Sequence, residues 1–395
     1  MKILVINSGS SSIKSTLFEF KKHPEIVAKA HIDGIGLKRC KLSFTFNKIN
    51  IGHQTSVNNH ENGVKLILQT LLKTKAIKNY KEIEAVGHRV VHGGEKYTNS
   101  VRIDSKILKA IKKLSELAPL HNPANIASIK ACKTLLPKAK QVAVFDTAFH
   151  QTMPPHAYLY GLPLEYYEKH QIRRYGFHGT SHKYVVAQTI KALKTKKAKI
   201  ISCHLGNGSS ITASVNGKSI DTSMGFTPLE GVIMGTRSGS IDPAIIFHLE
   251  EQLKMKPHQV NKILNNESGL KGISGISSDM RDIYHQSLKG NKRAALAIDI
   301  LAYQIAKYCG AYAAAMQGLT AIAFTGGIGE KAFYVRAKVC DYLEFLKLKL
   351  DKKKNENCKD VSTPVEISDR HSKIKIFVIK TDEEIQIANE TKALL

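Results

Sequence analysis

Apolar and polar residues follow two alternating patterns along the chain. Short apolar runs typical of β-strands occur at 3–6, 15–20, 86–90, 141–145, 200–203, 210–215, 321–325 and 374–379. Segments with the apolar spacing of amphipathic helices lie between them, for example at 62–73, 105–117, 181–193 and 291–316. This succession of strands and helices predicts an α/β protein.

A strand–turn–strand unit occurs twice, about half a chain apart. The apolar strand near the N-terminus leads into NSGSSSIK at 7–14, and a second apolar strand leads into HLGNGSSI at 204–211. When Ile13 is placed on Ile211, the serines before them align as well. Either stretch alone is explained equally well by an ordinary hairpin turn. Together they indicate a duplicated domain whose Gly, Ser and Asn turns offer N–H and hydroxyl donors to a polyphosphate.

The end of the chain carries two further local signals. Thr381 and Glu384, in the sequence TDEE, predict a capping box that opens the last helix. The segment 351–362 is the most polar of the chain and predicts a surface loop.

Composition places the chain among ordinary globular proteins. It has 395 residues, of which 43% are hydrophobic, enough for two domains with cores of their own. Six widely spaced cysteines without a CxxC motif predict reduced thiols in a cytoplasmic protein. The apolar run at the start is too short for a signal peptide. Because 301–324 contains Lys307, it predicts a core helix followed by a strand and not a membrane span.

The charge is strongly positive, with 59 basic residues against 33 acidic ones and a net charge of +26. Such a charge is also found in proteins that bind nucleic acids or membranes. The lysines are scattered, however, and no basic segment carries interleaved aromatic residues. This distribution favours a basic surface on a protein that handles small anions, without a nucleic-acid or membrane partner.

Nine motifs, in order, make the chain similar to the acetokinase family of the sugar-kinase/actin/heat-shock ATPase superfamily. They are NSGSSSIK at 7–14, GHRVVHGG at 87–94, FDTAFH at 145–150, RRYGFHGTSH at 173–182, HLGNGSS at 204–210, DTSMGFTPLEG at 221–231, GTRSG at 235–239, TGGIGE at 325–330 and TDEE at 381–384. The resemblance implies two duplicated ribonuclease H-like (actin-like ATPase) domains with the active site in the cleft between them. The first would comprise 1–150 with 382–395, and the second 151–381.

The resemblance also implies a reaction, the reversible transfer of a phosphoryl group from ATP to acetate. It implies a homodimer that uses Mg²⁺, or alternatively Mn²⁺. Acetate is already ionised at neutral pH, so the reaction needs no general base. It needs fixed cations and good alignment, because a carboxylate must approach a polyanion.

The catalytic residues that the resemblance implies are Arg89, Asp146, His178 and Arg237. Arg89 would bind the acetate carboxylate, and Arg237 would stabilise the transition state. His178 would contact the phosphoryl oxygens, and Asp146 would act through the metal and its waters. Taken alone, an arginine is more often part of a surface ion pair, a histidine is usually structural, and Asp146 at a strand end suits a helix cap. His88, His92 and His182 fit such structural roles, as His204 does when judged alone.

The implied binding residues fall into four groups. The metal would use Asn7 and Glu383, although Glu383 also suits a helix N-terminus by its charge. Lys14 would contact ATP phosphate. The rest of the nucleotide would be bound by His204, Leu205, Gly206, Asn207, Gly208, Asp279, Met280, Arg281, Gly327, Ile328, Gly329, Glu330 and Lys331. The acetate methyl would lie among Val91, Leu120, Phe177 and Pro228, which are ordinary core residue types.

Three positions depart from the family pattern: Lys331 after GIGE, Asp382 in TDEE and Ser240 after GTRSG. Lys331 bears on nucleotide preference and Asp382 on metal affinity, while Ser240 has no evident physical consequence.

Two rival functions remain open. A propionate or other short-chain acyl kinase is close, because one methylene changes binding by only about 1–3 kcal/mol. An ATP-dependent binding protein of the same superfamily is the other, although it would not need Arg89. We further expect domain closure to bring Arg89 and Asp146 against Arg237, His178 and ATP.

Overall fold

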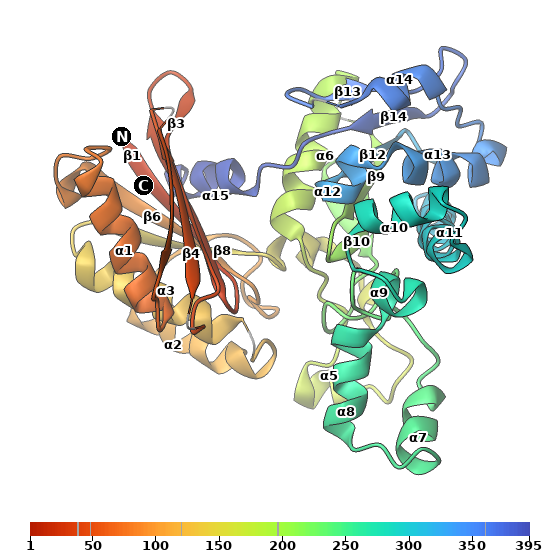
Figure 1. Cartoon of the computed structure of the whole chain (residues 1–395), viewed down its shortest axis with the longest axis horizontal. Helices are drawn as coiled ribbons and strands as arrows, with labels where there is room; N and C mark the ends of the chain where they lie inside the picture. Colours follow the sequence, from red (N-terminus) through yellow and green to blue (C-terminus); the bar gives the residue numbers. More distant parts are fainter. Residues whose placement is uncertain (38, 48, 120, 196, 360) are drawn as a thin grey trace. The chain divides into compact units, whose positions relative to one another are not determined.

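The computed structural model describes residues 1–395 except 38, 48, 120, 196 and 360. The chain forms two compact units, which are described separately (Figure 1). The first consists of Met1–Phe149 with Asp382–Leu395, and the second of His150–Thr381. Each contains a mixed sheet with helices, so the predicted α/β class is confirmed.

The described part of the first unit contains an eight-stranded sheet in the order β5-β4-β3-β2-β1-β6-β8-β7. The strands are β1 (Lys2–Ser8), β2 (Ser12–Phe20), β3 (Pro24–Asp33), β4 (Cys40–Phe46), β5 (Ile49–Thr55), β6 (Ile83–Val90), β7 (Val101–Arg102) and β8 (Lys140–Phe145). The helices are α1 (His60–Lys73), α2 (Ser105–Lys113), α3 (Asn122–Leu135) and α15 (Glu383–Lys392).

Successive side chains of β1 point to opposite faces of this sheet, and both faces are buried. Leu4 and Ile6 belong to the apolar cluster that includes α1 and α3. Ile3 and Val5 belong to a second cluster that includes Ile387 of α15. The C-terminal helix therefore completes the core of the first unit, although nearly the whole chain separates it from β1 in sequence.

The described part of the second unit contains a six-stranded sheet in the order β11-β10-β9-β12-β14-β13. The strands are β9 (Lys199–Leu205), β10 (Ser209–Val215), β11 (Lys218–Thr222), β12 (Ala321–Thr325), β13 (Val365–Glu366) and β14 (Lys375–Val378). The helices are α4 (Pro155–Tyr158), α5 (Glu165–His170), α6 (Gly179–Leu193), α7 (Ala244–Glu251), α8 (Pro257–Lys262), α9 (Gly269–Ser274), α10 (Met280–Leu288), α11 (Lys292–Ala315), α12 (Gly326–Lys331), α13 (Phe333–Tyr342) and α14 (Lys352–Asn357).

The central strand β9 is covered on both faces. Ile201 and Cys203 lie in one apolar cluster with Leu301 of α11. Ser202, which points to the opposite face, bonds His182 of α6 with 2.7 Å between the hydroxyl oxygen and Nδ1. Helices α6 and α11 therefore sandwich the sheet (Figure 1).

The two sheets share one pairing pattern. In the first, β3, β2 and β1 are antiparallel neighbours, and β6 and β8 continue parallel to β1. In the second, β11, β10 and β9 are antiparallel neighbours, and β12 and β14 continue parallel to β9. Both leading hairpins turn through three residues, 9–11 and 206–208. This equivalence is what a duplicated domain requires.

Three local predictions can be compared with the structure. The predicted loop at 351–362 is wrong in part, because Asp351 caps α14 by accepting a bond from Lys354 N at 3.0 Å. The predicted cap at Thr381 is also wrong. Asp382 caps α15 instead, with Ile385 N donating to its carboxylate at 2.9 Å. The segment 301–324 does form the end of α11 and then β12, and no described helix is long and apolar enough to cross a membrane.

Candidate active site

A row of polar side chains crosses three neighbouring strands of the first unit. Asn7 on β1 is paired with Lys14 on β2 and with Arg89 on β6. Directly paired residues point to the same face of a sheet, so the pairing groups these side chains. Asn7 and Arg89 both lie near the carboxyl ends of parallel strands, where α/β proteins bind ligands.

Arg89 is held by Asp146, the first residue after β8. Its Nη2 donates to Asp146 Oδ2 at 2.8 Å, and its Nη1 donates to Asn7 Oδ1 at 3.4 Å. The Nε of Arg89 is buried and donates to no partner among the described residues. Burial opposes the charge, but the carboxylates of Asp146 and Glu383 outweigh it and raise the pKa of Arg89. The guanidinium is therefore a fixed cation whose Nε–H is left without a partner among the described residues.

Glu383, the first residue of α15, lies in the same electrostatic cluster. Burial raises the pKa of Glu383; Arg89 and Lys14 lower it, whereas Asp146 and Glu384 raise it further. A bound divalent cation would offset both the burial and the repulsion between these carboxylates. The carboxylate and amide oxygens of Glu383, Asp146 and Asn7 are the kind of donors that Mg²⁺ prefers, so the residues fit the predicted metal.

In the second unit, His178 and Arg237 approach the same glycine. A methyl group at Gly208 would lie 3.1 Å from His178 Nε2 and 3.5 Å from Arg237 Nη1. His178 precedes α6 with a left-handed backbone (φ 56°), and its ring stacks on that of His204 with centroids 4.2 Å apart. The hairpin turn at 206–208 therefore brings together two groups that are distant in sequence.

Arg237 itself is a cation that forms no ion pair with a carboxylate of the described residues. Its Nη1 donates to the carbonyl of Pro228 at 3.1 Å, and burial lowers the pKa of the guanidinium. The loop that carries it is locked to the hairpin turn, because Gly235 N donates to Asn207 O at 3.0 Å. A side chain at Gly235 would clash with Asn207 Oδ1, only 1.9 Å from the Cβ position. This close approach fixes Arg237 relative to residues 206–208.

A pocket of about 650 Å³ adjoins this turn. It is lined by Gly206, Asn207, Ser278, Asp279, Met280, Arg281, Tyr284, His285, Gly327, Ile328, Lys331, Ala332, Phe333 and Tyr334. Eight of the predicted nucleotide-binding residues are among these, including Lys331. The volume and the mixture of backbone, charged and aromatic groups suit a nucleotide.

The other predicted nucleotide residues of this unit, His204, Leu205, Gly208, Gly329 and Glu330, lie outside the lining of this pocket. Leu205 is fully buried in β9. The carboxylate of Glu330 accepts bonds from Gly326 N at 3.1 Å and Thr381 N at 3.4 Å, so it braces the turn after β12. Direct nucleotide contact stays a prediction for these five residues, for Lys14 and for the eight that line the pocket.

Sequence reasoning missed the aromatic wall of the pocket. Tyr284 and Tyr334 stack with ring centroids 3.6 Å apart and an interplanar angle of 4°. Phe333 meets Tyr284 edge-on at 6.2 Å. The adjacent Phe333 and Tyr334 shortly after the glycine-rich TGGIGE were a usable signal, because aromatic residues make up only 7% of the chain.

Asp279 and Arg281 are fixed at the start of α10 on the rim of this pocket. Asp279 caps the helix by accepting from Arg281 N at 2.9 Å, and their side chains form an ion pair at 2.6 Å. Hydrogen bonds from the Arg281 side chain and backbone lower the pKa of Asp279 to about 2. The rim therefore presents a carboxylate that stays ionised at any physiological pH.

The residues predicted around the acetate methyl are placed separately. Val91 in the first unit is buried, and its N–H donates to Asn125 Oδ1 at 3.1 Å. Phe177 is buried and Pro228 half-buried in the second unit. Leu120 lies outside the described residues. Their common role in a substrate pocket, like the predicted cleft itself, stays a prediction.

Comparison with known proteins agrees with the motifs. The model of the acetokinase family matches residues 2–389. The chain belongs to the acetokinase family. It is 52% identical to an acetate kinase of Thermotoga petrophila, over 100% of this chain and 99% of the relative, and 48% identical to one of Clostridium acetobutylicum with the same coverage. The predicted family is thereby confirmed.

Solved structures give the same result for the fold. The crystal structure of Porphyromonas gingivalis acetate kinase is similar with a TM-score of 0.94 and 44% identity, covering 100% of this chain and 99% of that one. A propionate kinase from Francisella tularensis is similar with a TM-score of 0.93 and 43% identity, covering both chains completely. The predicted fold class, with two domains of the actin-like ATPase kind, is confirmed.

Proposed function

We propose that this chain is an acetate kinase that transfers the γ-phosphoryl group of ATP reversibly to the carboxylate of acetate. One observation within the second unit carries the proposal. Arg237 and His178 approach Gly208 in a turn whose other two residues, Gly206 and Asn207, line the nucleotide-sized pocket. This arrangement supports contacts between these cationic and hydrogen-bonding groups and the phosphates of a nucleotide bound in that pocket.

The reaction is a direct in-line displacement. A carboxylate oxygen of acetate forms a bond to the γ-phosphorus, the bond from that phosphorus to the β–γ bridging oxygen breaks, and ADP leaves. No proton moves, because acetate enters as an anion. The residues therefore need to bind and orient two anions and to stabilise charge on the transferring group.

The first unit supplies the groups for the acceptor. Arg89 has a buried Nε–H without a hydrogen-bond partner among the described residues. A hydrogen bond from this group to an acetate oxygen would offset the free-energy cost of burying it. Its bond to Asp146 at 2.8 Å prevents the guanidinium from rotating away. Arginine suits this task because its planar donors match a carboxylate.

The second unit supplies the groups for the donor. Arg237, which is paired with no carboxylate in the described part of the chain, would interact with oxygens of the γ-phosphoryl group. His178, fixed before α6 and stacked on His204, would donate to the same oxygens. The stacked tyrosines of the pocket would accommodate the base.

The metal belongs to this proposal as well. Asn7, Asp146 and Glu383 would hold Mg²⁺ or Mn²⁺ through oxygen atoms and bound waters. When bound, the ion supplies positive charge to the phosphate oxygens. Lys14, paired with Asn7 in the sheet, would add a further cation toward the ATP phosphates.

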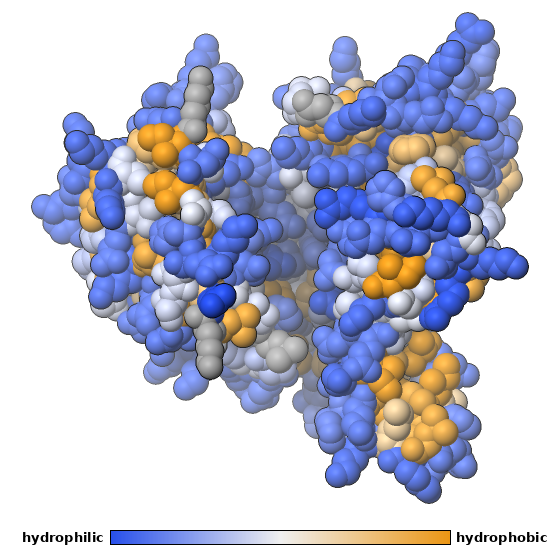
Figure 2. Space-filling view, in the orientation of Figure 1, coloured by the Kyte–Doolittle hydropathy of each residue, from blue (hydrophilic) through white to orange (hydrophobic). Residues whose placement is uncertain are grey.

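We also propose a homodimer in the cytoplasm. Helix α7 of the second unit leaves Ile245 and Phe247 exposed at 44% and 60%, and Leu253 just beyond it at 59%. Figure 2 shows hydrophobic residues gathered on the surface of the part that contains α7. Contiguous apolar exposure of this kind is typical of an interface. All six cysteines are buried free thiols, as expected of a reducing compartment. Light scattering on the wild type and on Phe247→Glu tests the dimer, and a monomeric wild type would refute it.

The decisive experiment traps acyl phosphate with hydroxylamine from purified protein, ATP and Mg²⁺. Acetate, propionate and butyrate are compared for the wild type, Arg89→Ala, His178→Ala and a control, Arg370→Ala, at an exposed arginine outside both groups. We expect acetate to be preferred, and product to be lost in the first two variants only.

Two other outcomes would change the assignment. The similarity to a propionate kinase is a specific reason to test propionate. If propionate is turned over as well as acetate or better, the chain is a propionate kinase with the same mechanism. ATP binding without any acyl phosphate would instead indicate an ATP-dependent binding protein.

A further inference from the structure

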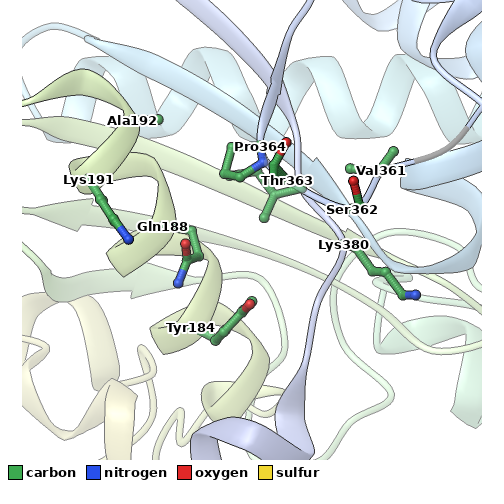
Figure 3. Close-up of a pocket in the computed structure, with 10 residues that line it drawn as sticks. Tyr184, Gln188, Lys191, Ala192, Val361, Ser362, Thr363, Pro364 and Lys380 are labelled. Atoms are coloured by element: carbon green, nitrogen blue, oxygen red, sulfur yellow. The ribbon is translucent and has the colours of Figure 1, made fainter. Parts of the chain in front are cut away.

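A second pocket lies in the second unit, apart from the nucleotide-sized one. Its volume is about 400 Å³, and its walls are one side of α6 and the segments that flank β13 and β14 (Figure 3). Helix α6 contributes Tyr184, Gln188, Lys191 and Ala192; the opposite wall consists of Val361, Ser362, Thr363, Pro364, Ile379 and Lys380. None of the residues proposed for catalysis lines it.

The charge of this pocket has one sign. Among its described lining residues are two lysines and no aspartate or glutamate. Figure 3 shows Lys191 on the same side of α6 as Gln188 and Tyr184, and the Lys380 ammonium extending away from that helix. Lys191 forms no ion pair with any described residue. The pocket therefore selects for an anion, with Lys191 as its principal cation.

The remaining lining narrows the class of anion. Ser362 and Thr363 add hydroxyl donors, whereas Ala192, Pro364 and Ile379 are apolar. Lysine ammonium and hydroxyl groups, without an arginine, suit a tetrahedral phosphate better than a planar carboxylate. The apolar wall suits a ligand with a hydrocarbon body, because burying that body adds binding energy.

Both walls of the pocket are connected to His204 by hydrogen bonds. Ser181, one turn before Tyr184 on α6, bonds His204 Nδ1 with 2.8 Å between the atoms. The same Ser181 hydroxyl lies 2.7 Å from the hydroxyl of Thr381, which directly follows Lys380. A ligand that pushes the walls apart or draws them together therefore acts on this hydrogen-bonded link.

We propose that this pocket binds a small phosphate monoester with an apolar body, and that its occupancy changes nucleotide affinity through Ser181 and Thr381. The binding half stands independently of the proposed kinase activity. The coupling half rests on the proposed function, because it assigns the second unit a nucleotide.

Calorimetry with phenyl phosphate tests the binding half. Benzoate and phenol serve as the planar-anion and uncharged counterparts of that probe. We expect phenyl phosphate to bind at least 10-fold more tightly than benzoate, and phenol not to bind measurably. Lys191→Met should weaken phenyl phosphate at least 10-fold, and Thr363→Glu, which adds a like charge from the opposite wall, should abolish binding. The control is Lys194→Met, a lysine beyond the end of α6 that does not line the pocket.

The outcomes separate this pocket from other anion sites. If Lys191→Met and Thr363→Glu both bind phenyl phosphate as the wild type does, the probe binds elsewhere and the proposal is overturned. The proposal is also overturned if ATP displaces phenyl phosphate competitively from these two variants. Equal weakening by Lys194→Met would show attraction to the basic surface only, and would overturn it as well. Thermal unfolding of each variant verifies that the three substitutions, all at exposed positions, leave the fold intact.

The coupling half is tested by measuring ATP affinity calorimetrically with and without saturating phenyl phosphate. We expect a change of at least 3-fold in Kd for the wild type and none for Ser181→Ala, in which the link is cut but the pocket lining is kept. An unchanged ATP Kd in the wild type would refute the coupling. If ATP binds with no acyl phosphate formed, the kinase assignment fails while both halves of this proposal remain measurable.

Discussion

The guanidinium of Arg89 donates to the carboxylate of Asp146 at 2.8 Å, across the ends of two neighbouring parallel strands. Asp146 is almost fully buried, with 1% of its side chain exposed. Such a pair is costly to form but costlier to break, because removing one partner strands a buried charge. At these strand ends the pair fixes the orientation of the Arg89 guanidinium.

Asp146→Asn tests this relationship. The amide keeps the shape and can still accept a bond, but it no longer neutralises Arg89. We expect acetyl phosphate formation to fall at least 100-fold in kcat with a rise in the KM for acetate, measured by hydroxylamine trapping. The exposed Asp33→Asn is the matched control. A variant with wild-type kinetics would mean that Asp146 has no role in the reaction.

Gly208→Ala tests the convergence of His178 and Arg237. The added methyl group would lie 3.1 Å from His178 Nε2, so the imidazole or the Arg237 guanidinium must shift. We expect kcat to fall roughly 10- to 100-fold, since a small displacement of the two groups proposed to stabilise the transition state is costly. Gly310→Ala is the control, because Gly310 lies in α11 and its Cβ position has no atom within 4 Å apart from the neighbouring residues and backbone of its own helix. Unfolding temperatures should not fall in the control.

Tyr334→Ala tests the aromatic wall of the pocket. Removing one ring of the stacked Tyr284–Tyr334 pair should raise the KM for ATP about 10-fold with little change in the KM for acetate. Tyr334→Phe keeps the ring and loses only the bond from its hydroxyl to Met280 O at 3.3 Å, so it should resemble the wild type. Equal effects of the two substitutions would show that the hydroxyl, and not stacking, matters.

Glu383→Gln tests the metal site. The neutral amide is a weaker ligand, so the Mg²⁺ concentration for half-maximal activity should rise roughly 10-fold or more. Mn²⁺ binding, followed by its paramagnetic resonance signal, should weaken in parallel. Glu61→Gln on the exposed side of α1 is the control. Unchanged Mn²⁺ binding in Glu383→Gln would remove this residue from the metal site.

The sequence predicted where strands end better than it predicted which strands pair with each other. Asp146 could be placed at a strand end because the apolar run 141–145 stops immediately before it. That Asn7 lies between Lys14 and Arg89 could not be predicted, because the pairing of β1 with β6 joins residues about 80 positions apart. Long-range register is set by the buried faces of the whole sheet, which local patterns do not contain.

Local chemistry was ambiguous for the same physical reason. Thr381 and Asp382 are both good cap residues, and the sequence favoured the first because Glu384 completed a capping box. In the structure the Thr381 hydroxyl bonds Ser181, which lies 200 residues away, and Asp382 caps α15 instead. The stacked pair Tyr284 and Tyr334 was missed likewise, since 50 residues separate its members.

Stability below neutral pH should depend on His88. This side chain is buried, its Nε2 lies 2.7 Å from Gln141 Oε1, and burial lowers its pKa from 6.5 to about 4. Above pH 6.5 the residue is neutral in both the folded and the unfolded chain, so its burial has no pH-dependent cost. As the pH falls from 6.5 toward 4, only the unfolded chain gains the proton, and folding loses about 1.4 kcal/mol per pH unit.

Urea unfolding measured at pH 7.5, 6.0 and 5.0 tests this expectation. By pH 5.0 the loss of folding free energy due to His88 should reach about 2 kcal/mol. His88→Gln cannot take up the proton, so this variant should lose less stability than the wild type between pH 7.5 and pH 5.0. Buried His182, whose pKa burial also lowers, should give the variant a remaining dependence of the same sign. His23→Gln, at an exposed position, is the control. Parallel pH profiles for the wild type and His88→Gln would show that His88 is not the group responsible.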